Sequence, residues 1–144
     1  MLVNKKGYYV IKVVLFFAFS KKESFSSKEL SERLEISEKV IEQVLLFLKN
    51  KGILSSKRGP QGGYKLLVDV SEMTVMDMIE MTGTNLDVLP IERSRKKKVI
   101  DGILGDMERE VMDGITSKLN KVRIKDLVSI MKEKVTEKGL SYMI

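Results

Sequence analysis

Residues 54–67 read LSSKRGPQGGYKLL, two short strand-like runs joined by a glycine-rich tip. The tip holds three glycines, which adopt positive φ at little cost, and Pro60, whose ring fixes φ. We therefore expect a tight β-hairpin. Because the glycines carry no side chain, such a tip can enter a narrow groove, and the charge of Arg58 suits the minor groove of DNA. Taken alone, the pattern is more typical of an ordinary surface hairpin. It does not fit a phosphate-binding loop, because Tyr64 stands where Lys and Ser or Thr are required.

Two helical patterns come directly before the hairpin. Ser26 and Glu29 have the spacing of a capping box, and Leu30 and Leu34 follow four residues apart, which predicts a helix over 27–34. Ser37 is a good N-cap for a second helix that ends near Gly52. The apolar residues of this second helix recur at helical spacing: Val40, Ile41, Val44, Leu45 and Leu48. Helix, tight turn, helix and hairpin together predict a winged helix-turn-helix.

The outer face of the second helix carries candidate base contacts. With the apolar stripe turned inward, Glu38, Lys39, Glu42, Gln43 and Leu46 lie on the outer face, where helix-turn-helix proteins contact bases. Gln43 can pair with adenine in two hydrogen bonds, Glu42 can accept from cytosine N4, and Lys39 can reach guanine or a phosphate. The alternative is a solvated helix face with no ligand.

The charge of the chain is divided unequally. Residues 1–67 hold 13 Lys or Arg against 6 Asp or Glu, a net +7, whereas residues 68–144 hold 13 against 14, a net −1. A basic domain attracts polyanions and speeds its encounter with them. Charge alone does not distinguish DNA from RNA or from an anionic membrane surface.

These segments together resemble a known family. The stretches NKKGYYVIKVVLFFAF, SSKELSERLEISEKVIEQVLLFLKNKGIL, SSKRGPQGGYKL and EMTVMDMIEMTG are similar to the Rrf2 family of bacterial winged-helix transcription regulators, over about residues 4–83. RGPQGGY is the most specific part. The resemblance implies a cytoplasmic homodimer that binds double-stranded DNA at a palindromic operator, usually as a repressor. It implies base or nearby backbone contacts from Ser37, Lys39, Glu42 and Gln43. For the wing it implies Arg58, Gly59 and Gln61.

The chain departs from the family pattern before the long helix. Several members are known to hold an iron-sulfur cluster there through three cysteines, but this sequence contains no Cys and no His. Thiolate and imidazole are the usual cluster ligands, so we expect no such cofactor and no soft-metal site. Residues 84–98 instead read TNLDVLPIERSRKKK. The basic run from Arg93 to Lys98 is interpreted as a solvated charge block, with phosphate contact or binding of a partner as alternatives.

Other helices are expected on both sides of the hairpin. Residues 5–19 form a nearly apolar helix that must be buried and is too short to span a bilayer. Thr74 and Asp77 cap a short helix that closes at Gly83. Residues 95–119 form one long amphipathic helix, whose most economical partner is the same helix of a second chain. A last short helix follows at about 124–131, and the tail after about Lys134 is expected to be disordered.

The expected fold is therefore mainly α with a small β-hairpin: a winged helix-turn-helix over 1–83, a loop over 84–94, and a dimerisation helix with a C-terminal helix over 95–144. The six methionines near the junction either fill the core or line an adaptable effector pocket: Met73, Met76, Met78, Met81, Met107 and Met112. The sequence has no His, no Cys, no glycine-rich nucleotide loop with its Lys, and no pair of carboxylates placed by a motif, so little supports an enzyme. The alternative function is a noncatalytic module that binds protein or RNA. A small-molecule or protein effector is compatible with the sequence, and a membrane partner is not expected.

Overall fold

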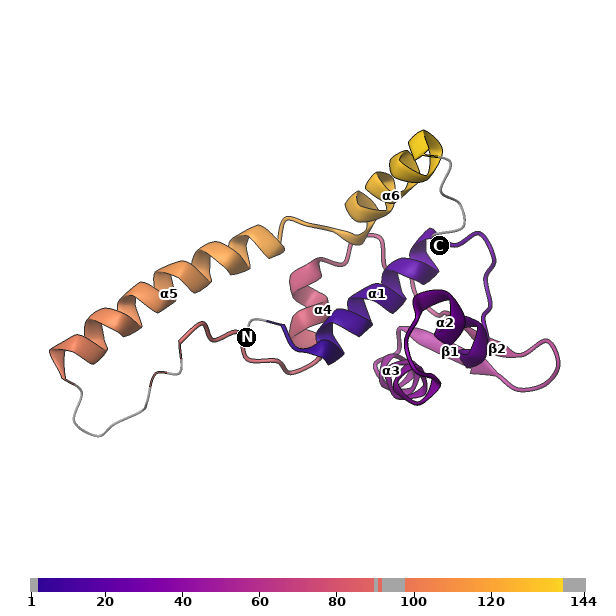
Figure 1. The fold of residues 1–144 in the computed structure, drawn as a ribbon, viewed down its shortest axis with the longest axis horizontal. Helices are drawn as coiled ribbons and strands as arrows, with labels where there is room; N and C mark the ends of the chain where they lie inside the picture. Colours follow the sequence, from indigo (N-terminus) through magenta and orange to yellow (C-terminus); the bar gives the residue numbers. More distant parts are fainter. Residues whose placement is uncertain (1–2, 90, 92–97, 139–144) are drawn as a thin grey trace.

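The computed structural model describes residues 3–89, 91 and 98–138. These residues form helices and a two-stranded antiparallel sheet (Figure 1). In chain order the elements are α1 (Lys5–Phe19), α2 (Ser27–Leu34), α3 (Glu38–Asn50), β1 (Leu54–Lys57), β2 (Gly63–Leu66), α4 (Val75–Met81), α5 (Val99–Leu119) and α6 (Ile124–Lys138). The mainly α fold with a small hairpin is confirmed.

Helix α1 lies at the centre of the core and packs against α3, α4, α6 and β2 (Figure 1). Its apolar run is buried as predicted, with Val10, Val13 and Val14 fully inaccessible to solvent. Lys12, the one charge in that run, donates from Nζ to the carbonyl of Leu34 at 2.7 Å and so binds an unpaired carbonyl at the end of α2. The ammonium thus satisfies the polar backbone of a neighbouring helix rather than interrupting the core.

Helices α2 and α3 start where the capping residues predict. The Ser26 hydroxyl accepts the backbone N–H of Glu29 at 3.1 Å, and the Ser37 hydroxyl accepts that of Val40 at 3.4 Å. Between the helices Glu35 turns the chain with φ 54°. This left-handed residue ends α2, and α3 then leaves in a new direction, which gives the predicted helix, tight turn and helix.

The hairpin pairs Leu54 with Leu66 and Lys57 with Gly63. A further antiparallel bridge joins Phe25 to Tyr64 through backbone hydrogen bonds of 3.0 and 2.8 Å. At Gly63 φ is 142°, and an added Cβ would lie 2.7 Å from the carbonyl oxygen of Phe25. Glycine is therefore required at Gly63 for both backbone conformation and space. The segment before α2 thus forms a short third edge of the wing.

The start of α6 is joined to the segment before α4. Thr74 and Asp77 form the predicted capping box, with hydrogen bonds of 3.0 and 2.8 Å. The backbone of Ile124 donates to Met73 at 2.9 Å, and the side chain of Ile124 is fully buried in the core. α6 continues to Lys138, so the expectation of disorder from about Lys134 is wrong for residues 134–138. Residues 139–144 lie outside the described part of the chain.

The methionines divide between core and surface. Met76 and Met78 are buried, and Met73 and Met81 pack against the core at its edge. Met107 is 48% exposed on α5. The interpretation as core filling is confirmed for the two buried residues of α4.

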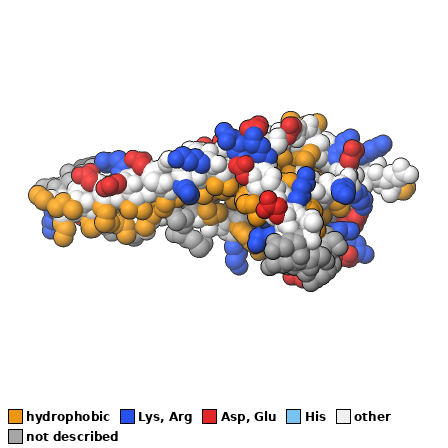
Figure 2. Space-filling model, turned by 90° about the horizontal axis from the view of Figure 1, so that it is seen from above, with side chains coloured by type: hydrophobic (Ala, Val, Ile, Leu, Met, Phe, Trp, Pro, Cys, Tyr) orange, Lys and Arg blue, Asp and Glu red, His pale blue; other side chains and the backbone are white. Residues whose placement is uncertain are grey.

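Helix α5 extends away from the core as an arm (Figure 1). None of its 21 residues, all of them described, is buried. Its apolar side chains gather along one side of the arm, with charged residues on the opposite side (Figure 2). They are Val99, Ile100, Ile103, Leu104, Met107 and Val111, all at least 42% exposed. These six residues are called the apolar stripe below.

The long helix begins later than predicted. The sequence pattern placed its start at about residue 95, but Lys98 is extended and α5 begins at Val99. The Asp101 carboxylate accepts the backbone N–H of Lys98 at 3.2 Å, which places an acidic residue in the first turn. A start among the lysines would place cations at the positive end of the helix dipole, which is unfavourable. In the part of the chain that is described, no helix is long and apolar enough to cross a membrane.

Candidate nucleic-acid interface

Helix α3 presents the predicted polar face to solvent. Lys39, Glu42 and Gln43 are exposed, whereas Ile41 and Leu45 on the opposite side are fully buried. This separation follows from the 3.6-residue period of the α-helix, which places residues i and i+4 on the same face. The polar side chains lie together over the first half of the helix, where they can reach an external ligand.

Ser37 and Leu46 complete this face in different ways. The Ser37 hydroxyl already accepts a backbone N–H as the cap of α3, so its own proton and its second lone pair are available to a ligand. Leu46 is 54% exposed, in agreement with its predicted outer position. An exposed leucine on such a face can contact the methyl group of a thymine, as other apolar side chains do.

The wing carries its three candidate residues at an open tip. Arg58, Gly59 and Gln61 are exposed, and the hairpin projects away from the helices (Figure 1). Gly59 has φ 108°, and its carbonyl accepts the N–H of Gly62 at 2.9 Å, closing the turn. An added Cβ at Gly62 would lie 2.2 Å from the carbonyl oxygen of Lys57. Gly62 thus allows the two arms to approach closely, while Gly59 and Gly63 supply the positive φ.

A side-chain contact between α3 and the wing was not apparent from the sequence. Lys49 Nζ donates to the Ser56 hydroxyl at 2.6 Å, joining the last turn of α3 to β1. The contact fixes the hairpin relative to the helix that precedes it. Seven residues separate Lys49 from Ser56 across a turn, so neither helical nor strand periodicity could have indicated it.

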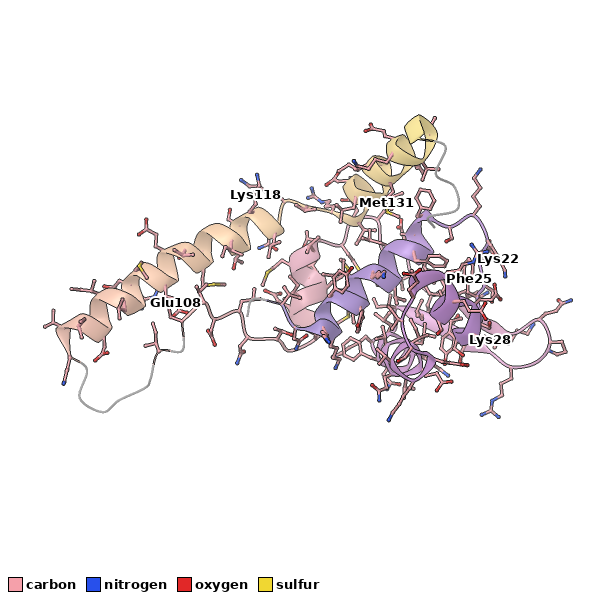
Figure 3. All side chains as sticks on the ribbon, in the orientation of Figure 1. Lys22, Phe25, Lys28, Glu108, Lys118 and Met131 are labelled. Atoms are coloured by element: carbon pink, nitrogen blue, oxygen red, sulfur yellow. The ribbon has the colours of Figure 1, made fainter. Side chains whose placement is uncertain are left out.

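Cations also surround the start of α2, again without a sequence signal. Lys22 Nζ lies 4.9 Å from the ring centroid of Phe25 and forms an ion pair of 2.7 Å with Glu29. Figure 3 shows Lys22, Phe25 and Lys28 close to α2 and the wing. The hydrogen bond from Lys22 lowers the pKa of Glu29 below its ordinary value of 4.5, and the backbone N–H of Ser26 adds to the effect. Glu29 is therefore ionised at neutral pH and takes up part of the local positive charge.

The segment before α5 is held to that helix by a carboxylate. Glu108, labelled in Figure 3, accepts the backbone N–H of Val88 at 2.9 Å and of Leu89 at 2.6 Å. Two charge-assisted hydrogen bonds to one oxygen fix this stretch against the arm. Of the basic run from Arg93 to Lys98, only Lys98 lies within the described residues. It is the N-cap residue of α5, and its backbone N–H donates to Asp101. The proposed roles of the other basic residues of the run fall outside the described residues.

Comparison with known proteins finds matches over most of the chain. The Rrf2 family model, described as an iron-dependent transcriptional regulator, matches residues 3–130. The HTH-type transcriptional regulator IscR of Photorhabdus laumondii is 30% identical over 131 residues, which cover 90% of this chain and 80% of that protein. IscR of Escherichia coli K12 is 29% identical, with 90% and 81% covered.

Solved structures show the same fold. CymR, the global cysteine regulator of B. subtilis, has a TM-score of 0.73 at 23% identity, with 90% of this chain and 98% of that chain covered. T. potens IscR has a TM-score of 0.71 at 23% identity, with 92% and 90% covered. At this identity the likeness establishes the arrangement of helices and wing, and nothing about ligands.

Iron binding of the usual kind does not fit this chain. The 144 residues contain no Cys and no His, the side chains that hold iron-sulfur clusters. Among the described residues no group of three acidic side chains is placed to hold a metal ion. The stretch of chain before α5 is held instead by the Glu108 carboxylate, through hydrogen bonds to backbone N–H groups. The donor set therefore disagrees with the iron dependence in the family description.

Proposed function

Because the chain belongs to the Rrf2 family of transcriptional regulators, we propose that it is a sequence-specific regulator that binds a palindromic operator as a homodimer and acts as a repressor. The observation that carries the proposal is the exposed polar face of α3, placed next to an exposed wing. The core contacts of α3 are made by its opposite face, so the fold does not depend on the side chains of Lys39, Glu42 and Gln43. Their chemistry is that of base readout.

In this proposal α3 lies in the major groove. Gln43 forms two hydrogen bonds with an adenine, Glu42 accepts from cytosine N4, and Lys39 binds guanine or a nearby phosphate. Ser37, at the start of α3, donates its hydroxyl proton to the sugar-phosphate backbone of the DNA. Each good base contact is worth about 1–3 kcal/mol of discrimination against the wrong base.

The wing lies along the neighbouring minor groove. Arg58 supplies positive charge, which a narrow minor groove attracts, while Gly59 lets the backbone come close and Gln61 offers an amide. The hydrogen bond between Lys49 and Ser56 supports the simultaneous fit of helix and wing, because it couples their positions.

The apolar stripe of α5 supports the homodimer. A row of six exposed apolar residues on one side of a helix is unusual on a monomer, and exposed patches of this kind mark contact surfaces. Two copies related by a two-fold axis would bury the same stripe twice and present two α3 helices to a palindrome. Such a regulator works in the cytoplasm on chromosomal DNA. Because the chain has no thiolates, it senses either a small molecule or partner protein, or no effector at all.

Selection of bound duplexes from random DNA tests the proposal. We expect an inverted repeat, with half-sites about one helical turn apart. The Gln43→Ala variant should then lose preference at one base step per half-site, by about 1–3 kcal/mol. Asn50→Ala is the matched control, because it removes an exposed amide at the other end of α3. Failure of selection to enrich any sequence, or equal behaviour of the two variants, would contradict the proposed readout.

A further inference from the structure

A cavity of about 470 Å³ lies between the first turns of α1 and the side of α3. It is lined by Lys5, Lys6, Tyr9, Val40, Gln43, Val44 and Phe47. Lys5, Lys6 and Gln43 are exposed, so the cavity opens to solvent at its polar side. The remaining lining residues are aromatic or aliphatic. The cavity thus has an apolar floor and a cationic edge.

The positive charge at this edge is held in place and is not neutralised. Lys6 Nζ lies 4.2 Å above the ring centroid of Phe47, a cation–π contact that restrains the ammonium at the cavity wall. Within the described residues neither Lys5 nor Lys6 forms an ion pair, and the first turn of α1 contains no acidic residue. The chain therefore presents two adjacent ammonium groups to an external anion.

Gln43 connects this cavity to the proposed reading face. Its side chain lines the cavity, and the same residue is the candidate adenine contact of α3. When a helix lies in the major groove, a sugar-phosphate strand runs along each side of it. The strand on the α1 side would pass directly over a cavity that borders Gln43.

We propose that this cavity binds one sugar-phosphate strand of the operator beside α3, with Lys5 and Lys6 contacting phosphates and the apolar floor contacting deoxyribose. The assignment rests on the proposed function and adds a clamp from α1 to it. Charge complementarity favours DNA as the occupant, because the two ammonium groups match the regular negative charge of the backbone. Such contacts position the protein on the duplex and carry no sequence information.

The test compares the variant Lys5→Met/Lys6→Met with the control Lys118→Met/Lys132→Met. Both remove two positive charges at exposed positions, but the control residues lie on α5 and α6. Methionine keeps an unbranched apolar stem, so contact with Phe47 survives while the charge is lost. Affinity for a selected operator and for a scrambled duplex is measured between 50 and 200 mM salt.

We expect the slope of log affinity against log salt to fall by about 1.8 for the Lys5/Lys6 variant, since each phosphate contact contributes about 0.9. The ratio of wild-type affinity to variant affinity then falls about tenfold between 50 and 200 mM salt. The ratio of operator affinity to scrambled-duplex affinity is the same for both proteins. Replacing single phosphates by neutral methylphosphonates locates the contact. One such position beside the half-site should weaken the wild type and leave the double variant unaffected.

Three other outcomes are informative. If the wild type binds its operator but the Lys5/Lys6 variant keeps the slope of the control, the clamp is refuted and the proposed regulator stands. If the wild type binds no duplex at any salt concentration, both proposals fail. If the methylphosphonate weakens binding by the double variant as much as by the wild type, the proposed phosphate contact of Lys5 and Lys6 is also refuted.

Discussion

Replacing Ile103 by glutamate should break the proposed homodimer without unfolding the protomer. Ile103 lies in the middle of the apolar stripe and is 63% exposed. Complete burial of such a side chain is worth about 1.5–3 kcal/mol, so burying the exposed part contributes about 1–2 kcal/mol per copy. A two-fold interface contains the residue twice, which gives about 2–4 kcal/mol.

The substitution removes this contribution and adds an unpaired carboxylate to the interface. At 1.4 kcal/mol for each factor of ten, the loss of apolar contact alone raises the dimer dissociation constant by about 30- to 700-fold. Sedimentation equilibrium over a range of protein concentrations measures that constant. Operator affinity should fall with it, because a monomer binds one half-site only.

The control is Arg109→Glu, which places the same side chain on the charged side of α5. Arg109 is 72% exposed there, and its one ion pair among the described residues is with Asp106, a surface pair of small energetic value. Both variants should keep the helical circular dichroism of the wild type, since no residue of α5 is buried. Equal dimer dissociation constants for Ile103→Glu and wild type would refute the stripe as the interface.

Three further predictions address other parts of the structure. Arg58→Ala should weaken operator binding and lower the salt slope by about one, and an unchanged slope would remove the wing from the phosphate contacts. Gly63→Ala should lower the free energy of unfolding by about 1–3 kcal/mol, because φ is 142° and the new Cβ meets the Phe25 carbonyl at 2.7 Å. Gly102→Ala, in open space on α5, should not lower it. Glu29→Gln should destabilise the protein at neutral pH. Because the folded state lowers the pKa of Glu29, its stabilising effect is present above 4.5 and is lost as the pH falls through the folded pKa. Melting curves of wild type and Glu29→Gln should therefore converge below pH 4.5, and a constant separation would contradict this.

The local chemistry of the helix ends is what the sequence predicted best. The capping pairs Ser26–Glu29 and Thr74–Asp77 both form. Each cap acts through residues three positions apart, so a short window of sequence contains the whole interaction. The same reasoning explains why the hairpin was predicted, since its turn needs glycine at fixed positions. The noncatalytic assignment also holds, because the family consists of transcriptional regulators.

Contacts between elements could not be predicted in this way. Lys6 on Phe47, Lys12 on the Leu34 carbonyl and Lys49 on Ser56 all join separate elements. From the sequence alone, each of these lysines is interpreted as an ordinary surface charge or as a break in an apolar run. Only the packing of the helices brings their flexible stems to a partner. The roles of the candidate site residues remain predictions, since exposure on α3 and on the wing is necessary for DNA contact without being proof of it.

Glu108 holds the segment before α5 in a chain that contains no Cys and no His. A segment that lacks helix or strand leaves its backbone N–H groups unpaired, and holding it against a neighbouring helix requires an acceptor. In this chain the acceptor is a carboxylate on α5, which takes the N–H groups of Val88 and Leu89. That contact depends on one residue of the arm that also bears the apolar stripe. In the proposed homodimer the position of the segment and the pairing of the two arms are therefore physically linked, because both depend on side chains of α5.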